Sequence, residues 1–87
     1  MPSVTRPMLT PVCIPELGAQ GLPLVISAWF VEPCDDIAPG DLLLEVCIPG
    51  ITSDIRATAT GRVASVLKDL DAPCREGEIV AWIEVAG

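Results

Sequence analysis

Proline and glycine interrupt this chain so often that no long helix can form. Nine of the 87 residues are prolines and seven are glycines. Proline cannot continue a helix interior, and Pro-Gly, Gly-Asp and Glu-Gly pairs are typical of tight turns. Between the interruptions lie short apolar runs rich in β-branched side chains, which favour strands. The sequence therefore predicts an all-β fold, with strands at residues 11–14, 24–31, 42–48, 51–57, 62–67 and 79–85.

The length and charge of the chain restrict its size class and its ligands. It is one small domain, in which residues 1–9 are predicted to be a flexible lead-in and residues 10–86 the folded part. The net charge of −7 repels phosphates, which excludes nucleic acid and disfavours anionic membrane surfaces as partners. A hydrophobic content of 51% excludes disorder. No apolar stretch is long enough to span a membrane and no secretory signal is evident, so we expect a cytoplasmic protein.

The side chains that most enzymes use are missing. The sequence contains no histidine and no tyrosine, and its single lysine is Lys68. Histidine-based triads and histidine metal sites are therefore excluded. The acidic residues gather in turns, where carboxylates usually form the turn itself. We predict no catalytic residue and no enzyme activity; the turn acids are Asp35, Asp36, Asp41, Glu45, Asp69, Asp71, Glu76 and Glu78.

A weak internal repeat relates the two halves of the chain. Residues 38–46 resemble residues 75–83 at an offset of 37, and in both a turn with Gly and an acidic residue begins an apolar strand. Residues 25–30 similarly match residues 62–67. Neither half could bury its own apolar face. The repeat thus predicts two intertwined halves related by a pseudo-twofold axis, which form a flattened barrel of two small antiparallel sheets.

Several motifs in chain order resemble the biotinyl/lipoyl attachment domain family, whose members include lipoyl domains of 2-oxoacid dehydrogenase acyltransferases and biotin carboxyl carriers. The motifs are Ile14–Gly18, Ile26–Pro33, Asp35–Val46, Gly61–Leu67 and Glu76–Glu84. None is specific alone, but the ordered series covers roughly residues 11–85. The resemblance implies a barrel-sandwich hybrid, and in most members a swinging prosthetic group on a lysine at a hairpin tip between the halves.

The attachment position of this family falls on a glycine here. When Glu45-Val46 and Gly61 are aligned with the family pattern, no gap is needed and the lysine position coincides with Gly50. Pro49-Gly50 is a good tight-turn pair, so we expect the hairpin to form. An amide-linked group has no attachment point on Gly50, and we predict no cofactor. Lys68 is interpreted as a solvated lysine that pairs with nearby carboxylates.

The four cysteines are Cys13, Cys34, Cys47 and Cys74, and none belongs to a Cys-x-x-Cys pair. Cys34 stands where the family usually has glycine, which predicts a left-handed backbone there. Cys13 and Cys74 are also compatible with small buried apolar residues. An even count in a short chain rich in proline and glycine predicts two disulfides, with three possible connectivities. One hypothesis is that the cysteines were engineered onto a natural scaffold. A cysteine-based metal site is an alternative.

These observations favour a non-enzymatic lipoyl-like domain that acts as a protein-interaction or scaffold module. It would present the Pro49-Gly50 hairpin and its acidic turns to a protein partner. The first alternative is a swinging-arm carrier domain that has lost its attachment site. The second is a metal-binding module built from the cysteines. Exposed sheet edges also make a homodimer a reasonable expectation.

Overall fold

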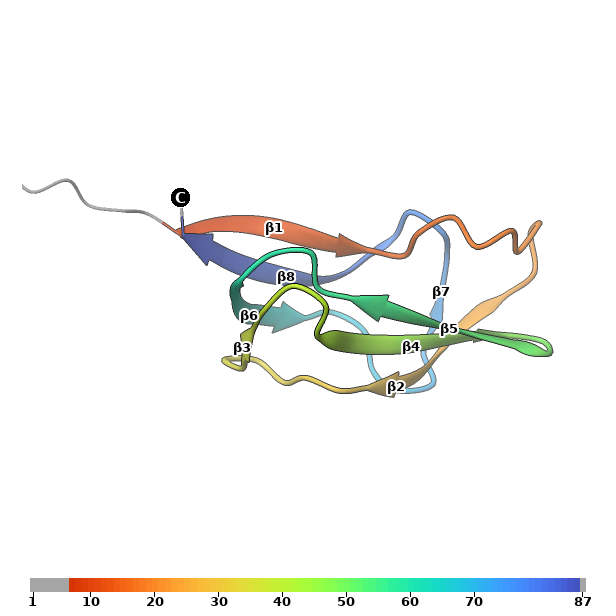
Figure 1. The fold of residues 1–87 in the computed structure, drawn as a ribbon. Coiled ribbons are helices and arrows are strands. Elements are labelled where there is room, and N and C mark those ends of the chain that lie inside the picture. The colour runs from red at the N-terminus through yellow and green to blue at the C-terminus, as the bar shows by residue number, and fades with distance from the viewer. Residues whose placement is uncertain (1–6, 87) are drawn as a thin grey trace, which may run out of the picture.

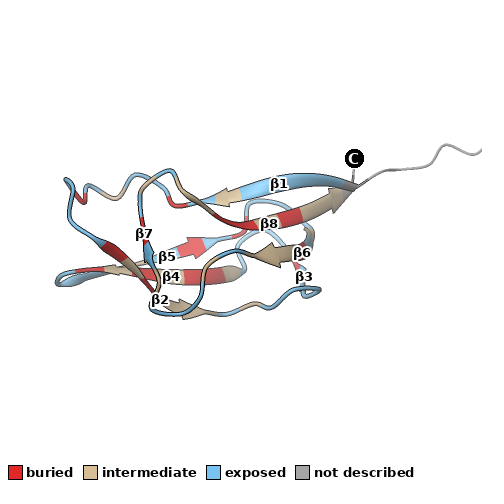
Figure 2. Ribbon diagram, turned by 180° about the vertical axis from the view of Figure 1, so that it is seen from behind, coloured by how far each residue is buried: buried red, intermediate tan, exposed pale blue. Residues whose placement is uncertain are grey.

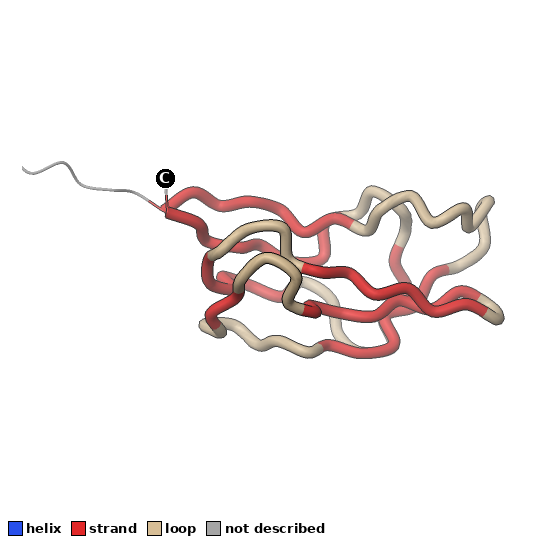
Figure 3. Tube along the Cα trace, viewed as in Figure 1, coloured by secondary structure: helices blue, strands red, loops and turns tan. Residues whose placement is uncertain are grey.

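The computed structural model describes residues 7–86, which form eight strands and no helix (Figures 1 and 3). The predicted all-β class is confirmed, and all six predicted strands are present with ends shifted by a few residues. None of the described residues belongs to a helix that could cross a membrane. The strands are β1 (Pro7–Cys13), β2 (Leu24–Trp29), β3 (Asp36–Ile37), β4 (Leu42–Ile48), β5 (Ile51–Arg56), β6 (Gly61–Val66), β7 (Pro73–Cys74) and β8 (Ile79–Ala86).

Two four-stranded antiparallel sheets pack face to face as a flattened sandwich. One sheet has the order β1-β8-β6-β3 and the other the order β5-β4-β2-β7. Each sheet takes strands from both halves of the chain, so the halves are intertwined as the repeat predicted. Exchanging β1–β4 with β5–β8 converts one order into the other. This correspondence is the expected pseudo-twofold relation between the halves.

The repeat extends to individual hydrogen bonds with the backbone. Strands β6, β7 and β8 each begin 37 residues after β2, β3 and β4. Asp41 and Glu78 are equivalent in the two halves, and each places a carboxylate oxygen on a backbone N–H three residues earlier, at 2.8 and 2.9 Å. Gly40 and Gly77 precede them, with φ values of 90° and 82°. The shared turn chemistry therefore begins β4 and β8 in the same way.

The core lies between the sheets and is almost entirely aliphatic. Buried stretches occur in strands of both sheets (Figure 2). In β4, burial alternates from Leu44 onward after two adjacent buried leucines, and Leu44 and Val46 are the most buried. No buried charged or polar side chain occurs in residues 7–86 apart from the thiol of Cys74. The largest fully buried side chains come from both sheets and from the segment after β1: Ile14, Leu24, Ile26, Leu44, Val46, Val63 and Val80.

The structure differs from the sequence prediction at the N-terminus and in two short strands. Strand β1 begins at Pro7, so part of the predicted lead-in pairs with β8. The lead-in prediction for residues 1–6 lies outside the described residues. Strand β1 lies at the edge of its sheet, where proline is tolerated because its missing backbone N–H need not pair with another strand, and Pro11 lies in this strand. Strands β3 and β7 have two residues each, too few to show an alternating pattern.

Candidate functional site

The hairpin between β4 and β5 is the place where the family resemblance puts a functional residue. Ile48 pairs with Ile51, so Pro49 and Gly50 form the whole connection. Gly50 has φ of 82°, as the third residue of a type II turn requires, and proline suits the position before it. The hairpin extends to one end of the molecule, at the right of Figure 1. The predicted tight turn is confirmed.

The tip is held by its strands and offers little reactive chemistry. Ile48 is buried beneath it, and Pro49, Gly50 and Ile51 are exposed. A Cβ atom placed on Gly50 would meet no other atom within 4 Å, so the glycine is needed for its backbone conformation and not for space. The nearby Cys47 is half-buried, and its thiol donates to the carbonyl oxygen of Ile48 at 3.5 Å. The turn itself has no amine, thiol or hydroxyl side chain.

Lys68 lies in the segment between β6 and β7, away from the hairpin in the chain, and its amine is engaged. Its Nζ lies 2.8 Å from Oε2 of Glu78, and both side chains are about two-thirds covered, at 32% and 31% exposure. The indole N–H of Trp29 donates to the carbonyl oxygen of Lys68 at 3.0 Å and fixes this segment. The Lys68 hydrogen bond lowers the pKa of Glu78, and the N–H of Arg75 lowers it further. Lys68 is thus paired with a carboxylate as expected, but the partner is Glu78 and not the neighbouring Asp69 or Asp71, and the side chain is partly covered and not solvated as predicted.

The four cysteines are all free thiols in the structure, so the predicted disulfides are not supported. They lie on separate elements: Cys13 ends β1, Cys34 follows β2, Cys47 lies in β4 and Cys74 in β7. An even number of cysteines carries no information about the distances between them, so the number alone could not predict which of them pair. Among residues 7–86, no group of three or more His, Cys, Asp or Glu side chains could hold a metal ion.

Two of the cysteine predictions concern single residues. Cys34 has φ of 77°, which confirms the expected left-handed backbone. Cys74 is buried as a small apolar residue, whereas Cys13 is exposed. Burial raises the pKa of the Cys74 thiol, and the Glu78 carboxylate raises it further, so Cys74 is not an activated nucleophile.

Three of the eight predicted turn acids, Asp35, Asp41 and Glu78, accept hydrogen bonds from backbone N–H groups of turns, whereas Asp36 and Glu45 lie in strands β3 and β4. Asp35 accepts a hydrogen bond from the N–H of Glu32 at 2.8 Å, and Asp36 pairs with Arg62 at 3.4 Å. Sequence reasoning missed the contact between Ser27 Oγ and the Glu45 carboxylate, at 2.7 Å, because it crosses between β2 and β4. It also missed an apolar pocket between the sheets, which five strands and a connecting segment assemble.

Comparisons with known proteins agree with this geometry. A sequence model of the family described as biotin-requiring enzyme matches residues 10–83, so the chain belongs to the biotinyl/lipoyl attachment domain family. The fold is similar to the solution structure of the lipoyl domain of the 2-oxoglutarate dehydrogenase complex from Azotobacter vinelandii. The TM-score is 0.68 at 17% identity, over 94% of this chain and 99% of that one. No curated protein sequence matches the chain.

Proposed function

We propose that this chain is a non-enzymatic biotinyl/lipoyl-type domain that carries no prosthetic group and acts as a protein-interaction module. The observation that carries the proposal is the composition of the hairpin tip. Pro49 and Gly50 form the complete turn, and neither has an amine. In this family the group is joined by an amide bond to a lysine at this position. The residues present at the tip do not fit such a group.

The single lysine of the chain is a poor substitute. A swinging arm needs an amine on an exposed tip, whereas Lys68 is partly covered and bound to Glu78. Its backbone is also anchored, because its carbonyl oxygen accepts the Trp29 indole N–H. Attachment at Lys68 would break the ion pair and leave the Glu78 carboxylate without its cation. These contacts support a structural role for Lys68.

The tip retains features that suit a contact with another protein. A Pro-Gly turn is rigid, so little conformational entropy is lost when a partner binds it. Ile51, 57% exposed, places an apolar side chain beside the turn. The net charge of −7 favours a partner surface rich in lysine and arginine. An alternative is that the domain was once a swinging-arm carrier and has lost its attachment site. The expectation that the chain forms a homodimer remains a prediction.

The experiment uses a lipoate ligase and a biotin ligase with their substrates, and measures intact mass. We expect no adduct on the unmodified protein. The variant Gly50→Lys supplies the amine at the tip, and Thr52→Lys is a matched control that places a lysine on the adjacent strand. An adduct on Gly50→Lys alone would identify position 50 as the former attachment site. An adduct on Lys68 of the unmodified protein would contradict the proposal.

A further inference from the structure

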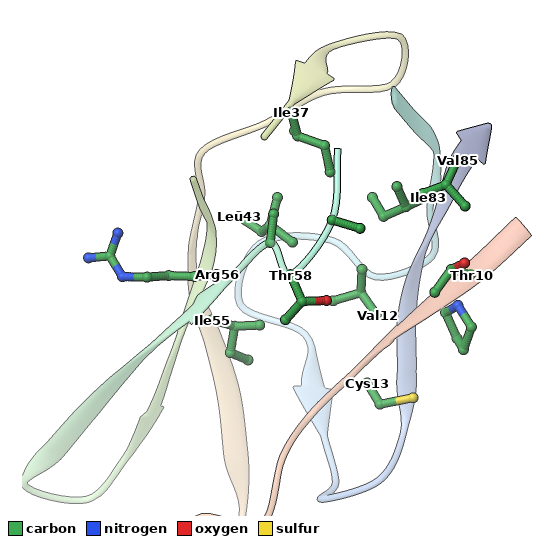
Figure 4. A pocket seen from close by; sticks show the side chains of 13 residues that line it. Thr10, Val12, Cys13, Ile37, Leu43, Ile55, Arg56, Thr58, Ile83 and Val85 are labelled. Atoms are coloured by element: carbon green, nitrogen blue, oxygen red, sulfur yellow. The ribbon is translucent and has the colours of Figure 1, made fainter. Parts of the chain in front are cut away.

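A pocket of about 190 Å³ opens between the two sheets, lined on two sides by the edge strands β1 and β5. Its inner wall is part of the hydrophobic core. In Figure 4, Ile37, Leu43 and Ile83 come from three different strands and point into the same space. The pocket therefore reaches from the surface, where about half of its lining residues are exposed, to the edge of the core. It lies in the body of the sandwich and does not include the hairpin turn.

The pseudo-twofold relation explains why this space is present. Ala57 and Ile14 hold equivalent backbone positions in the two halves. The N–H of Ala57 donates to Asp41 at 2.8 Å, and the N–H of Ile14 donates to Glu78 at 2.9 Å. Their carbonyl oxygens accept from Gly40 and Gly77, which are themselves equivalent.

The two equivalent positions carry side chains of very different size. Ile14 is 1% exposed and packs in the core cluster, whereas Ala57, although buried, is much smaller and lines the pocket. A small residue at one of two matched positions leaves space that its neighbours only partly fill. Ala57 therefore leaves part of the space that the pocket occupies.

The lining has little charge to offer a ligand. Arg56 contributes to the wall, but its guanidinium points away from the pocket in Figure 4. That group donates to the carbonyl oxygen of Gly40 at 3.0 Å and lies 3.5 Å from Asp54. The remaining polar side chains are the hydroxyls of Thr10 and Thr58 and the thiol of Cys13, and the rest of the lining is aliphatic. Such a site favours an uncharged ligand, because a charged one would lose its hydration without a partner.

We propose that this pocket is a non-covalent binding site for a small, uncharged, apolar molecule of about the size of benzene. An apolar cavity of roughly 150 Å³ accepts benzene in another protein, so the volume here suits the same class of ligand. Binding would use the space left by Ala57 and bury the ligand against Leu43 and Ile83. The site is independent of the proposed role of the hairpin.

The test is a benzene titration followed by methyl NMR. We expect saturable shifts at Val12, Leu43 and Ile83, which line the pocket, and none at Val80, which is buried but outside the lining. The variant Ala57→Ile adds the side chain that the fold already accommodates at the equivalent position 14. It should weaken benzene binding at least tenfold.

A matched control makes the same substitution outside the pocket. Ala38 is exposed and does not line the pocket, and its equivalent in the second half is Arg75, so its turn accepts a long side chain. Ala38→Ile should bind benzene as the unmodified protein does.

A second readout needs no substitution. Cys13 lines the pocket and is exposed, whereas Cys34 is exposed but does not line it. Benzene should slow the reaction of Cys13 with iodoacetamide several-fold and leave Cys34 unchanged. The proposal is overturned if benzene produces no saturable shifts up to its solubility limit, if Ala57→Ile binds it equally well, or if both thiols respond alike.

Discussion

Cys34 and Asp71 hold equivalent positions in the two halves, and both have a left-handed backbone, with φ of 77° and 67°. The N–H of Cys34 donates to Val63, and the N–H of Asp71 donates to Ile26, each at 2.8 Å. The two segments that cross between the sheets therefore require the same turn. The left-handed region is more costly for cysteine than for aspartate, whose side chain tolerates it better.

Replacing Cys34 with glycine should stabilise the protein. Relief of the left-handed backbone strain should stabilise the folded state by about 1–2 kcal/mol. Part of this gain is lost because glycine gives the unfolded chain more conformational freedom. We expect a net increase of about 0.5–1 kcal/mol in the free energy of unfolding, measured with urea under reducing conditions. Cys34→Ala is the control, since it removes the thiol but keeps the Cβ atom. Equal stabilisation by both variants would show that the thiol, and not the backbone, was responsible.

A Cβ atom at Gly61 should be much more harmful than one at Gly50. At Gly61 it would overlap the backbone carbonyl oxygen of Glu84 in the neighbouring strand, which cannot move without disturbing the sheet. Overpacking of this kind costs about 1–3 kcal/mol. The Cβ atom of Gly50→Ala would meet open space. This variant should lose only about 1 kcal/mol of stability, because alanine is strained at a positive φ. Thermal unfolding measures the stability of both variants. An equal loss of stability in the two would contradict the close contact at Gly61.

Truncation of Ile14 should create in one half of the fold the kind of space that Ala57 leaves at the equivalent position of the other half. Ile14 is almost fully buried in the core cluster. Ile14→Ala should lower the free energy of unfolding by about 2–5 kcal/mol. Ile51→Ala, at an exposed position on the hairpin, is the matched control and should change stability by less than about 0.5 kcal/mol. Urea unfolding measures both, and similar losses would mean that Ile14 is not a core residue.

The ion pair of Lys68 and Glu78 should give part of the stability a dependence on pH. The pKa of Glu78 lies below its ordinary value of 4.5, so the stability it contributes is complete above that value. This contribution is lost as the pH falls through the lower pKa of the folded state. Lys68→Met should therefore reduce stability at pH 7, and the difference from the unmodified protein should shrink in acid.

Urea unfolding from pH 7 down to pH 3 measures the effect at Glu78. Arg62→Met, which removes a more exposed pair with Asp36, controls for the loss of a positive charge. A constant difference between Lys68→Met and the unmodified protein across this range would contradict the linkage.

Much of the fold was predictable because turn chemistry repeats along the chain. The equivalent turns at Gly40 and Gly77 require the same residue types, so the repeat is visible in the order of the amino acids alone. The turn at Pro49 and Gly50 followed from its residue types, and its role as the hairpin tip from the family resemblance. The strands of two residues were not predictable, since neither Asp36–Ile37 nor Pro73–Cys74 is long enough to show a period.

The thiol states and the pocket were beyond sequence reasoning for a different reason. Cysteine pairing depends on distances between strands, and parity alone predicted bridges that the structure does not contain. The pocket is lined by side chains from several strands, with Ala57 among them. Only the equivalence of Ala57 with Ile14, which rests on matching backbone hydrogen bonds in the two halves, shows that position 57 could hold a larger residue.

We propose that this biotinyl/lipoyl-type domain carries no prosthetic group, either at the hairpin tip or on Lys68, its single lysine. The most direct measurement is the intact mass of the protein isolated from cells that attach lipoyl and biotinyl groups to their own carrier proteins, with peptide mapping of Lys68. We expect the mass of the unmodified chain and an unmodified Lys68 peptide. A stoichiometric lipoyl or biotinyl adduct on Lys68 would contradict this proposal and would make this domain a carrier with a relocated arm.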